Sequence, residues 1–189
     1  MGKRSTFDRR DRDYYPTPVS AIKPLVPHLP AVGSYIEPCA GASHLIRGLA
    51  EVWPGGDCVY ASDIEPQSPG IARADLAAPM PLDGVDLFIT NPPWPAMGQR
   101  GEPVISIARH LSALRPTWLL LSSDFAFNAY FGPLSPICRM IVAVGRVSWE
   151  GNGVAGKDNA AWYLFDDRLG SQWPGRSVDP VFKARGVAA

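Results

Sequence analysis

Short apolar segments alternate with segments of helical spacing through most of this chain. Such alternation predicts an α/β fold, a parallel sheet with helices on both faces. Pro24 and Pro27 should shorten or kink the first helix, because proline removes a backbone donor and clashes with the preceding turn. The expected helices cover residues 18–29, 43–52 and 102–114, and the expected strands 34–39, 58–62, 85–90 and 117–123.

The two last apolar segments, 139–149 and 160–166, are joined differently. Their glycine-rich connection, 151–157, is too short for a crossover helix, so we predict an antiparallel pair at this end of the sheet. The length of 189 residues suits one domain. We assign that domain to residues 14–170, between a flexible polar arm at 1–13 and an irregular tail at 171–189.

The composition is that of a soluble globular protein, with 46% hydrophobic and 19% charged residues. No stretch reaches the ~18 apolar residues of a membrane span. The odd number of cysteines, three, without a CxxC pair, favours a reducing compartment, and we predict a cytoplasmic protein without membrane contact. The three histidines lack ligand-like spacing, so no metal site is predicted.

The end of the first strand carries an acidic residue followed by a turn of small residues. Small side chains let a ligand approach the backbone, and ligands of open α/β sheets bind at the carboxyl ends of the strands. Asp63 ends the next strand, where a carboxylate can accept hydrogen bonds from ribose hydroxyls. The spacing is not GxGxxG, which argues against a dinucleotide. The turn comprises Glu37, Pro38, Cys39, Ala40, Gly41, Ala42 and Ser43, and Ser43 is the expected N-cap of the next helix.

A more specific motif, Asn91-Pro92-Pro93-Trp94, directly follows the apolar strand 85–90. Two consecutive prolines fix the backbone and donate no hydrogen bonds, which leaves nearby carbonyls as acceptors. The Asn91 amide oxygen adds another acceptor, and Trp94 adds a flat apolar surface. Acceptors beside a stacking surface suit a planar ring that carries an amino group.

In these motifs the chain resembles the class I S-adenosylmethionine-dependent methyltransferases that modify amino groups, and most closely the short, phage-type N6-adenine DNA methyltransferases. That resemblance implies a Rossmann-like, mostly parallel seven-stranded sheet with an antiparallel final strand. Four segments match in order. They are Tyr15-Pro16-Thr17-Pro18, the turn from Glu37 to Ser43, Asp63-Ile64, and the tetrapeptide from Asn91 to Trp94, which resembles the catalytic [DN]-P-P-[YFW] motif.

The resemblance also implies how the cofactor, S-adenosylmethionine, would be held. The segment that begins at Tyr15 would contact its methionine end, and Gly41 would let the backbone pass beneath it. Glu37 would lie near the cofactor's amino group or order its pocket. Asp63 would hold the ribose. Two further residues would meet the cofactor's adenine, Ile64 by packing on the ring and Asp75 by bonding its amino group, although Asp75 could instead cap a turn.

For catalysis, the Asn91 oxygen and the Pro92 carbonyl would accept both N6 hydrogens of a flipped-out adenine, and Trp94 would stack on the base. The resemblance implies a second aromatic wall near the last hairpin, for which we name Trp149; an ordinary core aromatic is the alternative.

Nucleic acid, expected to be DNA, is therefore the predicted substrate, but three other functions stay open. These are methylation of adenine in RNA, methylation of protein glutamine, and a non-catalytic scaffold. Acidic and basic residues balance at 18 each, whereas nucleic-acid binders often carry a basic excess. We expect no separate target-recognition domain in a chain of this length, and the loops 95–101 and 150–158 are the expected places for recognition. Either the sequence specificity is low, or a homo-oligomer or a partner supplies it, or the substrate is not duplex DNA.

Overall fold

The structure is a computed structural model that describes residues 15–94, 102–149, 159–168 and 181–183. The arm at 1–13, the loops expected to recognise substrate, and most of the tail at 171–189 lie outside the described residues. No helix in the described ranges is long and apolar enough to cross a membrane.

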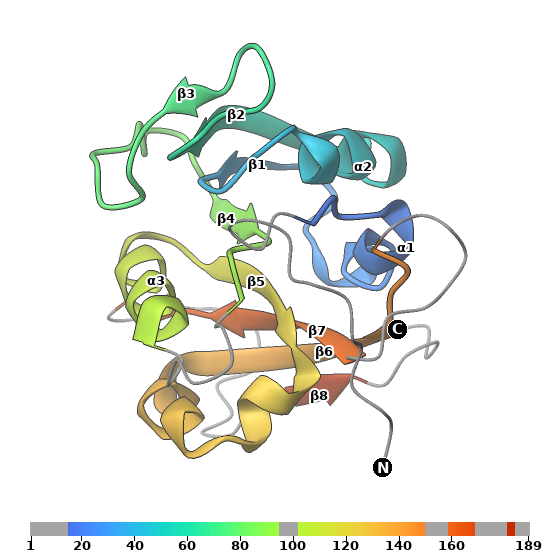
Figure 1. The fold of residues 1–189 in the computed structure, drawn as a ribbon, viewed down its shortest axis with the longest axis vertical. Coiled ribbons are helices and arrows are strands. Elements are labelled where there is room, and N and C mark those ends of the chain that lie inside the picture. Colours follow the sequence, from blue (N-terminus) through green and yellow to red (C-terminus); the bar gives the residue numbers. More distant parts are fainter. Residues whose placement is uncertain (1–14, 95–101, 150–158, 169–180, 184–189) are drawn as a thin grey trace.

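One sheet runs through the whole molecule, in the order β3-β2-β1-β4-β5-β7-β6-β8 (Figure 1). Strands β1 to β5 pair in parallel, and β7 is antiparallel to both of its neighbours. This confirms the mostly parallel sheet and the antiparallel strand predicted from the short connection. The strands are β1 (Gly33–Glu37), β2 (Gly56–Asp63), β3 (Ala72–Arg73), β4 (Leu87–Thr90), β5 (Thr117–Ser122), β6 (Cys138–Arg146), β7 (Asn159–Phe165) and β8 (Val181–Lys183).

The strand β8 adds an element to the seven expected strands. It lies within the segment 171–189, for which we expected irregular structure, and pairs in parallel with the outer side of β6. Three residues, two apolar and one charged, are too short a run to predict a strand. The edge of β6 supplies the pairing partner that selects the extended conformation.

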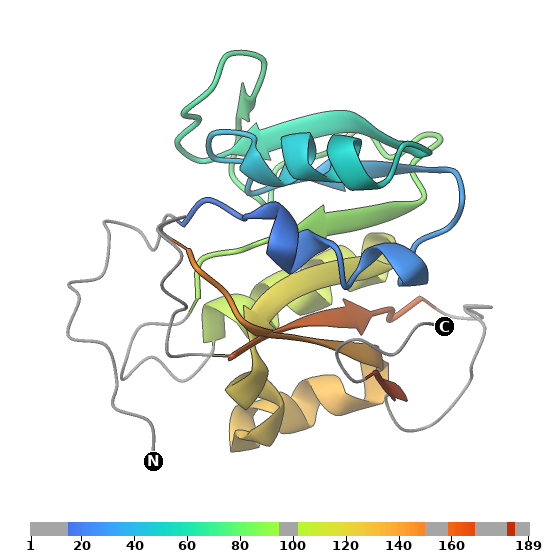
Figure 2. The same cartoon turned by 90° about the vertical axis from the view of Figure 1, so that its right-hand side faces the viewer.

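Helices cover both faces of the sheet, as the alternation predicts. Helices α1 (Val19–Ile22) and α2 (His44–Val52) lie across one face (Figure 2), and α3 (Glu102–Leu114) covers the other. Successive strand residues point to opposite faces. Tyr35 accordingly packs with α1 and α2, whereas the next residue, Ile36, packs beneath α3.

The two prolines of the segment 18–29 act as expected. Helix α1 ends at Ile22, and the chain continues as the short 3-10 helix η2 (Val26–His28). The predicted cap of α2 is only half correct. Ser43 does occupy the N-cap position, but its φ of 63° is left-handed and its side chain makes no capping hydrogen bond.

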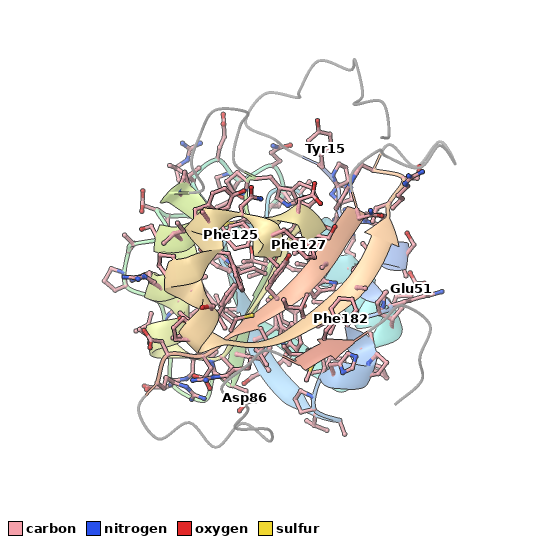
Figure 3. All side chains as sticks on the ribbon, turned by 90° about the horizontal axis from the view of Figure 1, so that it is seen from below. Tyr15, Glu51, Asp86, Phe125, Phe127 and Phe182 are labelled. Carbon is pink, nitrogen blue, oxygen red and sulfur yellow. The ribbon has the colours of Figure 1, made fainter. Side chains whose placement is uncertain are left out.

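Between β5 and β6 the chain forms two 3-10 helices that the sequence did not predict, η3 (Ser123–Phe127) and η4 (Ala129–Ile137). Pro133 and Pro136 lie inside η4 and interrupt the hydrogen bonding of an α-helix. Phe125 of η3 is buried, whereas Phe127 is exposed at the face shown in Figure 3. The Tyr163 hydroxyl anchors η3 by accepting from the Ala126 N–H at 3.3 Å.

Candidate functional site

The end of β1 places a carboxyl group inside the protein. Glu37 is 1% exposed, and its Oε1 accepts hydrogen bonds from the Thr90 hydroxyl and, at 3.4 Å, from the Cys39 N–H. The other oxygen, Oε2, is buried and has no hydrogen-bond partner. A buried polar atom without a partner is costly, so this oxygen marks a place that a donor would stabilise.

Burial changes the charge of this carboxyl group. Loss of hydration raises the Glu37 pKa to about 8, against the opposing effect of the hydrogen bonds from Thr90 and Cys39, and the nearby Asp63 raises it further. At neutral pH the Glu37 carboxyl is therefore mostly protonated in the free protein. A cation placed beside it would stabilise the carboxylate and lower the pKa again.

Asp63, at the end of β2, closes the turn that follows β1. Its two carboxylate oxygens each accept one backbone N–H at 2.8 Å, Oδ2 from Gly41 and Oδ1 from Glu65. Gly41 itself is buried and has a φ of 49°, a left-handed conformation that suits glycine. Because a carboxylate offers about four lone pairs, Asp63 keeps acceptor capacity for a hydroxyl-bearing ligand.

Two further predicted cofactor residues, Ile64 and Asp75, follow β2 and β3 in the chain. The Ile64 side chain is 61% exposed although it is large and apolar. Such exposure at the carboxyl end of a parallel strand suits a surface that a ligand covers. Asp75 caps the turn after β3, where its Oδ1 accepts from the Ala77 N–H at 2.8 Å. This is the alternative that the sequence left open for Asp75, and its contact with a cofactor stays a prediction.

The tetrapeptide follows β4, the strand beside β1. The Asn91 amide donates from Nδ2 to the Thr17 hydroxyl at 3.0 Å. Among the described residues, no hydrogen bond engages the Asn91 Oδ1 or the Pro92 carbonyl. Two acceptors of adjacent residues are thus left available at the carboxyl end of β4. Pro92 is buried, and Pro93 is exposed.

The aromatic residues predicted to contact substrate lie together. Trp94 is held by its indole N–H, which donates to the Leu120 carbonyl of β5 at 2.9 Å. Its ring meets Trp149 edge to face, with centroids 5.6 Å apart and planes at 86°. A ring inserted between parallel walls needs about 3.5 Å on each side. The two indoles in this arrangement therefore form a corner and not a slot, and a base would stack on one of them.

Tyr15 joins the same cluster, with its ring centroid 6.3 Å from that of Trp149. Figure 3 shows Tyr15 on the opposite side of the molecule from Asp86, which immediately precedes β4. Tyr15 therefore lies on the side of the carboxyl ends of the parallel strands. This places it with the tetrapeptide, 76 residues later in the chain, as the order of motifs predicts.

The structure thus brings the predicted residues to neighbouring strand ends, and it adds one that the sequence analysis missed. Thr90 is fully buried and links β4 to Glu37 of β1. A polar residue at the end of an otherwise apolar strand was the available signal. No group of three or more metal-binding side chains occurs in the described part of the chain.

Comparisons with known proteins identify the fold and no more. No protein-family model matches the sequence. No curated protein matches it either. Among solved structures, a dimethyladenosine transferase from Plasmodium falciparum matches with a TM-score of 0.52 at 13% identity, over 81% of this chain and 62% of its own. A modification subunit assigned to a type I restriction enzyme from Vibrio vulnificus YJ016 matches with a TM-score of 0.53 at 13% identity, over 93% of this chain and 48% of its own.

The chain therefore spans less than two thirds of the length of either protein. At this identity the likeness concerns the fold. It confirms the Rossmann-like class I methyltransferase fold that the sequence motifs imply.

Proposed function

We propose that this protein transfers a methyl group from S-adenosylmethionine to the N6 amine of adenine in DNA. The observation that carries the proposal is the pair of available acceptors on Asn91 and Pro92, at the end of the strand next to the buried Glu37. An exocyclic amine brings two N–H donors and needs two acceptors. The adjacent Trp94 supplies a surface on which a planar base can stack.

The residues at the ends of β1 and β2 suit the cofactor chemically. The Glu37 Oε2 lacks a donor, which an ammonium group would provide, and Asp63 retains lone pairs for ribose hydroxyls. The exposed Ile64 offers an apolar surface for an adenine ring. When bound, S-adenosylmethionine supplies an electrophilic methyl group on a sulfonium centre.

The amine of adenine is a poor nucleophile because its lone pair is delocalised into the ring. Asn91 Oδ1 and the Pro92 carbonyl would each accept one N–H, draw the nitrogen toward tetrahedral geometry and localise that lone pair. The two acceptors are fixed before substrate arrives, so positioning and electrostatics supply the acceleration. No strong base is needed, and the amide of Asn91 is not one.

The edge-to-face arrangement of Trp94 and Trp149 would let the target base stack on one of the two indoles. In a duplex the target would have to leave the stack, at a cost of a few kcal/mol. Stacking of the base on one indole would stabilise the flipped-out state by about 1–3 kcal/mol. Trp94 is the better candidate for this contact, because it directly follows the two acceptors and is anchored to β5.

Two proteins with the same fold support a nucleic-acid substrate. One is a dimethyladenosine transferase, and the other is described as a modification subunit of a type I restriction enzyme. RNA and protein glutamine are the competing substrates. The balance of 18 acidic and 18 basic residues favours an accessory partner or a second copy that contributes to DNA binding.

The test is transfer of a labelled methyl group from S-adenosylmethionine to unmethylated DNA, to RNA and to a protein extract, with digestion of nucleic-acid products to nucleosides. The proposal expects labelled N6-methyladenine from DNA. Label only in RNA would show that RNA, and not DNA, is the substrate. Label only in protein would favour methylation of glutamine over methylation of adenine. Binding of S-adenosylmethionine without transfer to any of the three would favour a non-catalytic scaffold function.

A further inference from the structure

Thr17 makes a contact that the sequence motifs do not assign. It is 6% exposed, and its hydroxyl oxygen accepts the Asn91 Nδ2–H at 3.0 Å across 74 residues of sequence. The resemblance places Thr17 at the cofactor. In the structure its hydroxyl contacts the side chain of the tetrapeptide.

The orientation of the Asn91 amide determines what the substrate meets. An amide side chain presents an acceptor oxygen on one side and a donor NH2 on the other, and a half-turn of the group exchanges them. An exocyclic amine that must give up two hydrogen bonds needs the oxygen. With the Thr17 hydroxyl as the acceptor of the Nδ2–H, as in the structure, Oδ1 is directed away from Thr17.

The Thr17 hydroxyl is well supported in this place. Pro16 and Pro18 on either side restrict the backbone, because each has a fixed φ. The following helix α1 is tied to the sheet, where the Trp162 indole N–H donates to the Ala21 carbonyl at 2.8 Å. The contact therefore joins a restrained segment before α1 to the end of β4.

We propose that Thr17 is a positioning residue for catalysis, which fixes the Asn91 amide so that its oxygen faces the substrate amine. This inference rests on the proposed function. It differs from cofactor binding, because it predicts that loss of the hydroxyl impairs methyl transfer and leaves the affinity for the cofactor unchanged.

The experiment compares T17V, which keeps the shape and removes the acceptor, with T17S, which keeps the hydroxyl. Turnover on DNA and the Kd for S-adenosylmethionine are measured for each. We expect T17V to lower kcat about fivefold to tenfold, the worth of one net hydrogen bond, with an unchanged Kd. T17S should stay within about twofold of wild type.

A double-mutant cycle with N91D separates orientation from a structural role. A carboxylate presents an oxygen on both sides, so a half-turn no longer changes what the substrate meets, although the Thr17 hydroxyl can still donate to it. The tetrapeptide motif admits Asp at this position. T17V should therefore lower kcat less in the N91D background than in the wild type. An equal loss in both backgrounds would show that Thr17 acts through general packing, and would overturn the inference.

Two other results would also contradict the positioning role. A loss of cofactor affinity in T17V with kcat intact would make Thr17 a cofactor contact only. Wild-type turnover in T17V would remove any role in catalysis. If instead the wild-type protein methylates no adenine, the proposed function itself fails, and the inference fails with it.

Discussion

The affinity for S-adenosylmethionine should depend on pH through Glu37. In the free protein the Glu37 pKa is raised to about 8, chiefly by burial. The carboxyl must lose its proton to pair with the cofactor's ammonium group. Below pH 8 the ionised fraction grows about tenfold for each pH unit, so the affinity should rise about tenfold between pH 6 and pH 7. Near pH 8 the increase ends, because the ammonium group begins to lose its own proton.

The assay is isothermal titration calorimetry at both pH values, in buffers of different ionisation enthalpy. Near pH 7 binding should release close to one proton to the buffer. Glu37→Gln should bind more weakly at pH 7 and lose both the pH dependence and the proton release. Other groups near Glu37 are not expected to substitute for it, since burial also raises the pKa of the Cys39 thiol and keeps it neutral. An equal wild-type Kd at pH 6 and pH 7, without proton release, would refute this reasoning.

Three further substitutions test the fold and the cofactor residues. Asp63→Asn should weaken cofactor binding about tenfold and lower the Tm, because it removes a charged acceptor from the turn at Gly41; unchanged affinity would remove Asp63 from the site. Ile64→Ala should also cost about tenfold in affinity. The Tm of Ile64→Ala should stay unchanged because the Ile64 side chain is 61% exposed. The control Val32→Ala, at a position that is 79% exposed, should change neither the cofactor affinity nor the Tm. Gly55→Ala should cost about 1–3 kcal/mol in urea unfolding. Its Cβ would lie 1.9 Å from the Ala31 carbonyl oxygen, and equal stability to wild type would contradict that packing.

Much of the architecture could be predicted from local pattern. The segments that became β1, β4, β5 and β7 are largely buried on both faces, so their central residues are mostly apolar. The helix expected at 102–114 is α3. By contrast, η3 and η4 were missed because short 3-10 turns rich in proline carry no helical period.

The site was predictable as a set of strand ends but not as a set of contacts. Parallel strands bring their carboxyl ends together, so Glu37, Asp63 and Asn91 could be grouped from their positions alone. The bonds from Thr90 to Glu37 and from Asn91 to Thr17 span 53 and 74 residues. Such pairings depend on the register of neighbouring strands and on where α1 is packed, which no local pattern determines.

The same limit applies to the aromatic residues. The family resemblance implied that Trp94 faces a base and that Trp149 is either a second aromatic wall or an ordinary core residue. The structure shows them in mutual contact at 86°, with Trp94 anchored to the Leu120 carbonyl. The roles of both indoles in substrate binding stay predictions.

The proposed function depends above all on Asn91, which would orient an adenine amine for methyl transfer. Its most direct test is single-turnover transfer of labelled methyl from S-adenosylmethionine to unmethylated DNA by wild type and by Asn91→Ala, with the cofactor Kd measured for both. We expect labelled N6-methyladenine with the wild-type protein, and loss of transfer in the variant at nearly unchanged Kd. Transfer by Asn91→Ala at the wild-type rate would contradict it.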